Sequence, residues 1–534
     1  MLEVELLIIG AGPAGTAAAL TAREFGIETL LVDESPLDPA NLQRNIPKWY
    51  GSRDAARQVS ASTVYHWLES RADLQQAIEA GAEVLTQHAA WGTFPNRVVG
   101  IFDGTRTWLV QARQIILASG STDLHLAFPG WTLGGVLGGG AALQLLDTYG
   151  YLNGKRMLIL GSGDLGLTVA ERAIQAGLEV VGIVEIEPRI QGNPILAREL
   201  EQAGVCFFLG QTIKEAEGGG ELERVRLLTV SGEPPTVTPG PEIEVDTLCV
   251  AIGRQPAIEL AYLSGCAMAY DRLRGGFYPR HDQQMRTSQE GILVAGDLAG
   301  ARDATFRSPD HAERSGRTAA SSVAEALGRV DGDRARHDLE DRSIAAQPTS
   351  DGDLPRGAQS FASAWHAVAE ALAGDDLIIC RCEEVTRGEV LAAEEFTGGD
   401  HPDEVKRVSR AGMGLCQGRG CRPLIAGLLA SRSGRAFSEL PIASYRPPLR
   451  PLPLGALATE EKRAVPQLAQ FLELEARLRH DVQAGILQPQ ALTRYHWRVD
   501  TLAYRWAEQG KSDEELRGIV EDLERQIRYT AKWR

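Results

Sequence analysis

Residues 4–34 read VELLIIGAGPAGTAAALTAREFGIETLLVDE, and this stretch decides the fold of the first part of the chain. The apolar run from Val4 to Ile9 predicts a buried strand, and the Ala-rich segment that opens near Thr16 predicts a helix. Between strand and helix lies the hexapeptide Gly10-Ala11-Gly12-Pro13-Ala14-Gly15. A strand, a glycine turn and a helix in this order are typical of a domain that holds the phosphates of a dinucleotide.

Each glycine of the hexapeptide has a physical role in that structure. Gly10 permits a tight turn, Gly12 lets the backbone approach a pyrophosphate, and Gly15 lets helix and strand touch. The phosphates would then meet free N–H groups at the positive end of the helix. Asp33 follows the next predicted strand, where a carboxylate can accept the ribose hydroxyls. The alternative is a glycine-rich turn in another Rossmann-like fold, which this context on both sides disfavours.

Two later stretches favour FAD in this domain. Residues 114–120, QIILASG, predict a strand that ends at Gly120, and residues 291–297, GILVAGD, predict a strand that delivers Gly296 and Asp297 to an Ala-rich helix. Together they resemble the ATG-like and GD motifs of the large FAD-dependent oxidoreductases with two dinucleotide domains. The resemblance implies that Asp297 contacts the ribityl chain. It also implies that the helix points its N-terminus at the flavin, where a positive end would stabilise negative charge.

A second glycine loop follows the predicted strand 157–160, and the acid after the next strand is Glu185. The loop is Gly161-Ser162-Gly163-Asp164-Leu165-Gly166. In the resembling families such a domain takes a nicotinamide nucleotide, and residues 251–256 look like the return strand to the flavin domain. Asp164 places a carboxylate near the pyrophosphate position, and the lack of a basic pair after Glu185 disfavours NADP. Two interpretations stay open, an adenine nucleotide (NAD or ATP) and a retained fold with structural glycines.

Four of the seven cysteines form two close pairs separated by a segment predicted to be helical. The pairs are Cys380-Arg381-Cys382 and Cys416-Gln417-Gly418-Arg419-Gly420-Cys421. Four converging thiolates bind metal, and the single residue within the first pair is tighter than structural zinc sites use. The stretch resembles the small [2Fe-2S] domain of the bacterioferritin-associated ferredoxin type, whereas zinc or disulfides remain the alternatives. We expect nearby glycines (Gly412, Gly414, Gly418 and Gly420) to turn N–H groups toward the sulfurs. The other cysteines, Cys206, Cys249 and Cys266, are expected to be buried reduced thiols.

The motif order resembles one family over most of the chain. The flavin motifs, the second loop, CRCEEVTRGEV, RAGMGLCQGRGC and RPPLRPLPLGALA look like the α (large) subunits of amino-acid dehydrogenase complexes. These are the opine oxidases, hydrogen cyanide synthase, and dye-linked proline and hydroxyproline dehydrogenases. The resemblance implies a partner β-subunit that oxidises the amine with its own FAD, and in some complexes an FMN at the interface. This chain would then be an electron relay with FAD and a [2Fe-2S] cluster, and its final acceptor stays unidentified.

The predicted fold class is α/β, with two Rossmann-like domains, a small α-helical [2Fe-2S] domain and a helical C-terminal extension. The expected boundaries are 1–125 with 275–330 for FAD, 126–274 for the second nucleotide domain, 331–375 for a linker and helix, 376–430 for the cluster, and 431–534 for the rest. The segment 446–453 is Pro-rich and should be extended along a surface. In the extension, Ser512 and Glu515 predict a capping box before an apolar helical face.

Composition narrows the function further. The net charge of −16 disfavours nucleic acid, and the first apolar run is too short to span a bilayer. We expect a cytoplasmic protein, with any membrane contact made through a partner. No cysteine precedes Cys206, so a disulfide reductase with a cysteine pair beside the flavin loop is improbable. The rival interpretations are a stand-alone NAD(P)H-dependent reductase of a ferredoxin or small acceptor, and a scaffold with vestigial sites.

Overall fold

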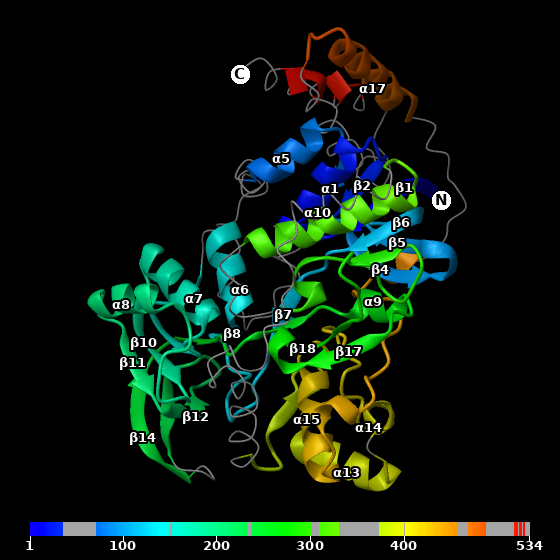
Figure 1. The fold of residues 1–534 in the computed structure, drawn as a ribbon. Helices are drawn as coiled ribbons and strands as arrows, with labels where there is room; N and C mark the ends of the chain where they lie inside the picture. Colours follow the sequence, from blue (N-terminus) through cyan, green and yellow to red (C-terminus); the bar gives the residue numbers. More distant parts are fainter. Residues whose placement is uncertain are drawn as a thin grey trace. The chain divides into compact units, whose positions relative to one another are not determined.

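The computed structural model describes residues 1–35, 71–149, 152–231, 236–301, 309–330, 373–399, 401–457, 468–487 and parts of 517–528 (Figure 1). The chain divides into two compact units. One comprises Met1–Ala77 with Ala82–Pro453, and the other Ile78–Gly81 with Leu454–Arg534. The predicted linker beyond residue 330 and the capping box of Ser512 and Glu515 lie outside the described residues.

The first sheet of the larger unit carries the first glycine loop. Its central strands are parallel, and an antiparallel hairpin extends one edge. In spatial order the strands are β3 (Glu83–Leu85), β2 (Thr29–Val32), β1 (Leu2–Ile9), β6 (Thr107–Leu117), β5 (Val98–Phe102) and β4 (Ala89–Phe94), with β19 (Ile292–Val294) paired to β6. Strand β2 is buried along its whole length, and β1 is buried from Leu6 to Ile9. Continuous burial is what a parallel sheet covered on both faces requires.

Two helices rich in small residues lie against each other in this domain. They are α1 (Pro13–Glu24) and α10 (Pro309–Ala326), which run side by side in Figure 1. A Cβ added at Gly316 of α10 would lie 2.0 Å from the carbonyl oxygen of Ala14, so the contact needs glycine. The short helix α5 (Ala72–Glu79) precedes β3 in the chain. The small side chains let α1 and α10 approach closely beside the glycine loop.

The second sheet is all parallel and carries the second glycine loop. Its order is β11 (Cys206–Leu209), β10 (Glu179–Glu185), β9 (Arg156–Leu160), β15 (Thr247–Val250) and β8 (Val136–Gly138). Its helices are α6 (Gly139–Leu143), α7 (Asp164–Gln175) and α8 (Pro194–Gln202). A three-stranded antiparallel sheet is inserted before β15, formed by β12 (Gln211–Glu217), β13 (Arg224–Ser231) and β14 (Thr236–Glu244). Cys206, expected to be buried, is exposed because it opens the edge strand β11.

Short strands join the two sheets. Strand β7 (Ser121–Asp123) follows Gly120 and pairs antiparallel with β16 (Arg254–Pro256), the predicted return strand. After β16 come α9 (Glu259–Leu263) and the hairpin of β17 (Met268–Asp271) and β18 (Gly276–Pro279). The chain therefore leaves and re-enters the first domain through two paired strands.

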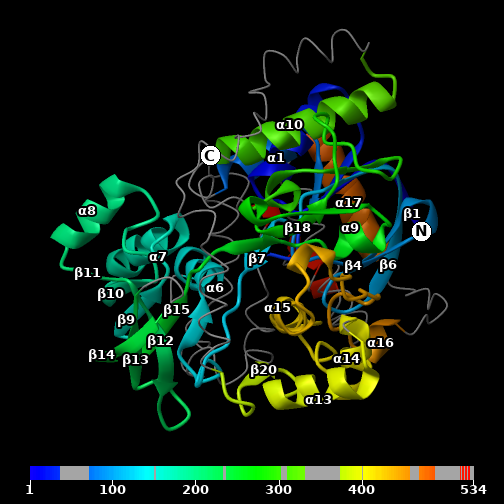
Figure 2. The same cartoon turned by 60° about the horizontal axis from the view of Figure 1, so that its bottom comes forward.

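The cysteine-containing segment forms a small, mainly helical domain. It consists of β20 (Ile378–Cys380), β21 (Val385–Thr386), α13 (Arg387–Thr397), α14 (Pro402–Ser409) and α15 (Cys421–Ser433). The three helices gather at one end of the larger unit in both views (Figure 2). A capping box between Thr386 and Glu389 starts α13.

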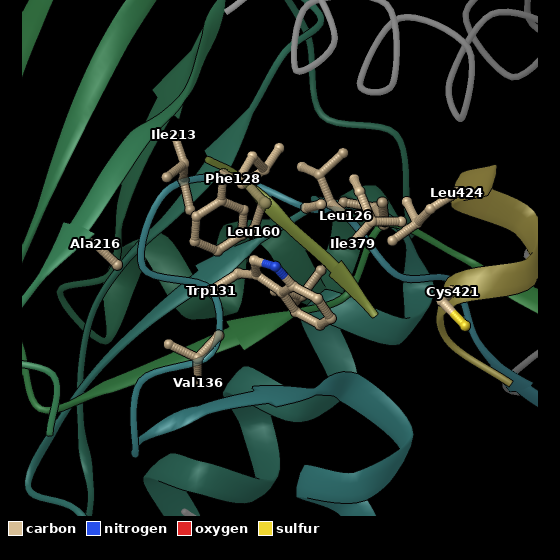
Figure 3. Close-up of a cluster of buried hydrophobic side chains, with 14 of the residues drawn as sticks. Leu126, Phe128, Trp131, Val136, Leu160, Ile213, Ala216, Ile379, Cys421 and Leu424 are labelled. Carbon is tan, nitrogen blue, oxygen red and sulfur yellow. The ribbon is translucent and has the colours of Figure 1, made fainter. Parts of the chain in front are cut away.

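The cysteine domain shares its apolar core with the second sheet. One continuous set of buried side chains contains Leu126 and Trp131 from the chain after β7, Leu160 from β9, and Ile379 and Leu424 from the cysteine domain (Figure 3). The indole N–H of Trp131 donates to the carbonyl of Ile378 at 2.7 Å. The domain is thus packed into the body and is not tethered by a linker alone.

The Pro-rich segment after α15 lies against β4. The N–H of Leu449 donates to the carbonyl of Trp91 at 2.7 Å, and the Leu449 side chain is buried in the core of the first domain. Arg450 forms an ion pair with Glu34, at 2.6 Å between Nε and the carboxylate. The predicted extended segment therefore covers the strand instead of only following the surface.

The smaller unit contains α16 (Leu454–Leu457) and α17 (Leu468–Gln483), and buries Leu474 and Leu478 of α17. Val520 and Leu523, predicted to belong to an apolar helical face, are also buried. In the part of the chain that the structure describes, none of the helices combines the length and apolarity that a membrane crossing requires.

Candidate functional site

The first glycine loop has the geometry of a phosphate-binding turn. Gly10 has a φ of +109°, and a Cβ there would lie 2.2 Å from the carbonyl oxygen of Ala118. A Cβ at Gly15 would lie 1.7 Å from the carbonyl oxygen of Gly10, whereas one at Gly12 meets nothing within 4 Å. Gly10 and Gly15 are therefore required by the fold. Gly12 faces open space at the N-terminus of α1, where a pyrophosphate fits.

Asp33 closes the loop from the end of β2. Its Oδ2 accepts a hydrogen bond from the N–H of Ala11 at 2.5 Å, and its Oδ1 accepts one from Ser35 at 2.6 Å. Arg71 donates to the carbonyl of Ala11 at 2.7 Å, a contact that the sequence did not suggest. Burial raises the pKa of Asp33 and the two backbone hydrogen bonds oppose that rise. The carboxylate is fixed at the edge of the loop where ribose hydroxyls are bound in such domains.

Asp297 is held in place by two neighbours from the paired strands β7 and β16. Its Oδ2 forms an ion pair with Nη1 of Arg254 at 2.9 Å and accepts a hydrogen bond from the Ser121 hydroxyl at 2.6 Å. The N–H of Gly296 donates to the hydroxyl of Ser315 on α10 at 2.8 Å. Sequence reasoning had placed Arg254 only in the return strand. Its pairing with Asp297 appears once β16 lies beside β7.

These residues fit FAD. Gly12 leaves room for the pyrophosphate, Asp33 is placed for the ribose, and Gly120 has open space at its Cα. Asp297 lies in the 3-10 turn Gly296–Ala299 that follows β19, and α10 begins at Pro309. When bound, FAD supplies both one-electron and two-electron redox chemistry. The chain's own part is to bind and orient it.

The second glycine loop repeats the backbone of the first. Gly161 has a φ of +106°, and a Cβ at Gly166 would lie 2.0 Å from the carbonyl oxygen of Gly161. Glu185 takes the position of Asp33 and has no exposed surface. Its carboxylate accepts hydrogen bonds from the N–H of Ser162 at 2.9 Å, the hydroxyl of Ser162 at 2.6 Å and the N–H of Glu187 at 3.0 Å. Burial raises the pKa of Glu185 to about 7, against the effect of these hydrogen bonds.

Asp164 binds a neighbouring loop of the same domain. Its Oδ1 accepts a hydrogen bond from the N–H of Asn193 at 2.7 Å, and the N–H of Gly192 donates to the carbonyl of Ser162 at 2.9 Å. A Cβ at Gly192 would lie 2.8 Å from the backbone nitrogen of Asp164. The loop between β10 and α8 is thus packed onto the start of α7. Nucleotide binding by Gly161, Gly163, Gly166 and Glu185 stays a prediction.

The four clustered cysteines meet as two thiol pairs. Cys380 pairs with Cys421 inside the domain, where both are buried, and Cys416 pairs with the exposed Cys382. The hydrogen bond from Cys421 lowers the pKa of Cys380 to about 6, and that from Cys382 lowers the pKa of Cys416 to about 5. One sulfur of each pair is therefore poised as a thiolate, the form that binds iron.

Backbone groups surround these sulfurs as expected from the glycines. The N–H of Gly412 donates to Sγ of Cys380 at 3.5 Å, and the N–H groups of Gly418 and Gly420 point to Cys416. Gly412 and Gly418 have φ values of +85° and +81°. Gly414 has a steric role beside Cys382. A Cβ there would lie 2.3 Å from Cβ of Cys382, so this glycine makes room for a ligand.

The four thiols are compatible with an iron-sulfur cluster. All four are free of disulfides. A [2Fe-2S] cluster takes two thiolates on each of two irons, so four cysteines that meet as two pairs can supply its ligands.

The cysteine loop touches the strands that carry the flavin residues. A Cβ at Gly420 would lie 3.2 Å from the ring of His125, a residue just after the end of β7. Gln255 of β16 donates to the carbonyl of Arg419 at 3.3 Å. The loop between Cys416 and Cys421 therefore rests on the same strand pair that holds Asp297.

Comparison with known proteins agrees with this arrangement. A sequence-family model described as pyridine nucleotide-disulphide oxidoreductase matches residues 4–325, and one described as BFD-like [2Fe-2S] binding domain matches residues 378–431. An opine oxidase subunit of Rhizobium meliloti (strain 1021) is 28% identical over 482 residues, which cover 85% of this chain and 98% of the relative. Hydrogen cyanide synthase subunit HcnB of Pseudomonas aeruginosa is 28% identical over 491 residues, with 85% and 98% covered. The crystal structure of L-proline dehydrogenase from P. horikoshii superimposes with a TM-score of 0.58 at 21% identity, over 86% of this chain and 80% of that one, which shows a shared fold.

Proposed function

Because this chain belongs to the pyridine nucleotide-disulphide oxidoreductase family and carries a BFD-like [2Fe-2S] domain, we propose that it is the electron-transferring subunit of a heteromeric amine or amino-acid dehydrogenase. The complex would act on the CH–NH or CH–NH2 bond of an amino acid, opine or secondary amine. The chain would bind FAD and a [2Fe-2S] cluster and relay electrons away from the oxidised amine.

Two kinds of evidence support this proposal. Curated relatives covered almost end to end are named as subunits, of opine oxidase and of hydrogen cyanide synthase. The chain itself offers no cysteine before Cys206, so the redox disulfide of the reductases in this family has no counterpart beside the flavin loop. Substrate oxidation is accordingly assigned to a second, FAD-containing subunit, and we place the complex in the cytoplasm.

One observation carries the assignment as a relay. Strands β7 and β16 hold Asp297 through Ser121 and Arg254. The cysteine loop contacts Gln255 of β16 and His125, which lies just after β7. The two expected redox groups would therefore be bound on opposite sides of one strand pair. Such an arrangement suits a chain that passes electrons between a flavin and a cluster.

A second candidate is a stand-alone NADH-dependent reductase. The regular backbone of the second glycine loop favours it, because Gly161 and Gly166 reproduce the crowding at Gly10 and Gly15. Electrons would then enter at the second domain instead of from a partner subunit.

Co-purification and anaerobic titration separate the two candidates. We expect the native protein to emerge with a smaller flavoprotein, to contain about two irons per chain, and to keep its visible flavin absorbance when NADH is added. Purification of a lone chain whose flavin absorbance is lost on addition of NADH would overturn the relay proposal in favour of the reductase.

A further inference from the structure

A cavity of about 620 Å³ lies between the flavin-side strands and the cysteine domain. Thr122 of β7 and Gln255 of β16 contribute to one wall, and Gly418 and Arg419 of the cysteine loop contribute to another. Its volume is in the range of pockets that enclose small organic ligands. The cavity therefore adjoins both the strands that position Asp297 and the loop that carries two of the cluster cysteines.

The cavity has an aromatic side. Tyr270 of β17 and Phe277 of β18 have ring centroids 5.0 Å apart and meet edge to face, and the tilted ring of Phe437 lies 5.5 Å from Tyr270 and 6.0 Å from Phe277. All three line the cavity, together with leucines of α15. Aromatic and aliphatic walls suit an apolar ring system, which would replace contacts with water by contacts with carbon.

Two of the arginines that line the cavity are already ion-paired. Arg419 forms an ion pair with Glu259 at 3.3 Å, while its Nη2 atom is buried and, among the described residues, has no hydrogen-bond partner. Arg387 pairs with Asp375 at 2.7 Å. The guanidinium of Arg422 donates hydrogen bonds to the carbonyls of Ala443 and Ser444. A neutral carbonyl oxygen needs only a spare N–H such as that on Nη2 of Arg419, whereas a phosphate dianion at the same place would be repelled by the carboxylate of Glu259.

From these features, we propose that the cavity binds a quinone as the electron acceptor, with one quinone carbonyl accepting a hydrogen bond from Arg419. The inference rests on the proposed relay function and names its acceptor class. Oxidation of the amine CH–NH bond to an imine releases two electrons and two protons. The quinone gains two electrons and, from water, two protons, so that both carbonyls become hydroxyls. An amine substrate fits the cavity less well, because Glu259 is the sole carboxylate among its described lining residues and is already paired.

Gly427 offers a way to fill the cavity without touching the cysteines. It lines the cavity from the middle of α15, and a Cβ added there meets nothing within 4 Å. A Gly427→Phe side chain would occupy the space of the ligand. Ser433→Phe places the same ring on an exposed turn of the same helix, outside the lining residues, and serves as the matched control.

The test is calorimetric titration of the full-length chain, purified with its flavin and cluster, with menadione as the probe. We expect saturable binding that is about tenfold weaker or worse in Gly427→Phe and unchanged within about twofold in Ser433→Phe. Phe277→Leu, which removes one aromatic wall, should weaken binding several-fold. Circular dichroism and iron content identify any variant that has lost its fold.

Absence of menadione binding to the wild-type chain, or equal binding by Gly427→Phe, would overturn the quinone proposal. So would binding of FMN that displaces menadione, because the cavity would then be a flavin nucleotide site. These titrations need no partner subunit. If the chain co-purifies with a flavoprotein but does not bind menadione, the relay proposal stands and only the quinone proposal is overturned.

Discussion

Ser162 binds the Glu185 carboxylate twice, through its N–H at 2.9 Å and its hydroxyl at 2.6 Å, in a site without exposed surface. In the equivalent pair of the first domain, Asp33 has a single contact with Ala11, through the backbone N–H, and Asp33 itself is partly exposed. The same fold thus places an acid beside each glycine loop, but only in the second domain is that acid enclosed. This difference leads to a prediction on pH dependence.

Glu185 should make the protein less stable as the pH rises through neutrality. Its pKa is raised from 4.5 to about 7 by burial, so the folded chain favours the protonated form. The stabilisation is fully present below pH 4.5 and is lost as the pH passes 7, with an upper limit of about 3 kcal/mol. Glu185→Gln keeps an acceptor for Ser162 and should flatten the decline of Tm between these pH values. Glu199→Gln, at an exposed position of α8, should leave the decline intact. A parallel decline in wild type and Glu185→Gln would contradict the prediction.

A substitution at Gly12 should impair FAD binding, whereas the same substitution at Gly15 should impair folding. Gly12→Ala is compatible with the fold of the loop, because its Cβ meets nothing within 4 Å of protein and its φ of −68° suits any residue. The added methyl would meet the pyrophosphate, so we expect FAD content to fall at least about tenfold with Tm of the flavin-free chain unchanged. Gly15→Ala would clash with the Gly10 carbonyl at 1.7 Å and should lower Tm itself. Flavin absorbance after gel filtration and thermal melts measure the two effects, and full flavin retention in Gly12→Ala would contradict the assignment.

Arg254 should act on FAD through Asp297. The ion pair of 2.9 Å is half-buried, so its loss should cost about 1 kcal/mol, or roughly fivefold in flavin affinity. Arg254→Gln should show this loss in equilibrium dialysis, and Arg254→Lys should recover part of it because the positive charge is retained. If both variants bind FAD as the wild type does, Arg254 has no part in positioning Asp297.

Replacement of a clustered cysteine should lower the iron content of the protein, whereas replacement of an isolated cysteine should not. Cys416→Ser should remove most of the iron and the visible absorption of the cluster, because one thiol pair loses a ligand. Cys266→Ser, in which a buried thiol of the first domain is replaced, should keep both. Iron analysis of the two variants gives the answer, and equal iron content would exclude Cys416 as a ligand.

Local sequence patterns predicted the strands that carry the flavin-binding residues. The strand before Gly10 and the strand before Gly296 are where the sequence predicted them, because each is set by neighbours in the chain. The four clustered cysteines do meet, but each thiol pairs with one from the other sequence pair, Cys380 with Cys421 and Cys416 with Cys382. The prediction that Cys206 is buried was wrong. Its exposure follows from the place of β11 at the edge of the sheet, and local periodicity carries no signal of strand order.

The contacts between segments that are distant in the chain could not be predicted from the sequence. Arg254 reaches Asp297 only when β16 lies beside β7, and Trp131 reaches Ile378 across 247 residues of chain. Neither residue carries a local signal that names its partner. Occupancy of the second glycine loop is still a prediction, since its geometry suits a nucleotide and a purely structural turn alike.

The bond from Trp131 to Ile378 also bears on how the protein matures in the cell. Because the cysteine domain and the second sheet share one core, iron that binds only the folded state stabilises both together. A chain made when iron is scarce would then loosen around Trp131 as well as around its cysteines, and proteases act on such openings. Quality control would remove the whole polypeptide, so that iron supply sets the abundance of the protein and not merely the fraction that is active.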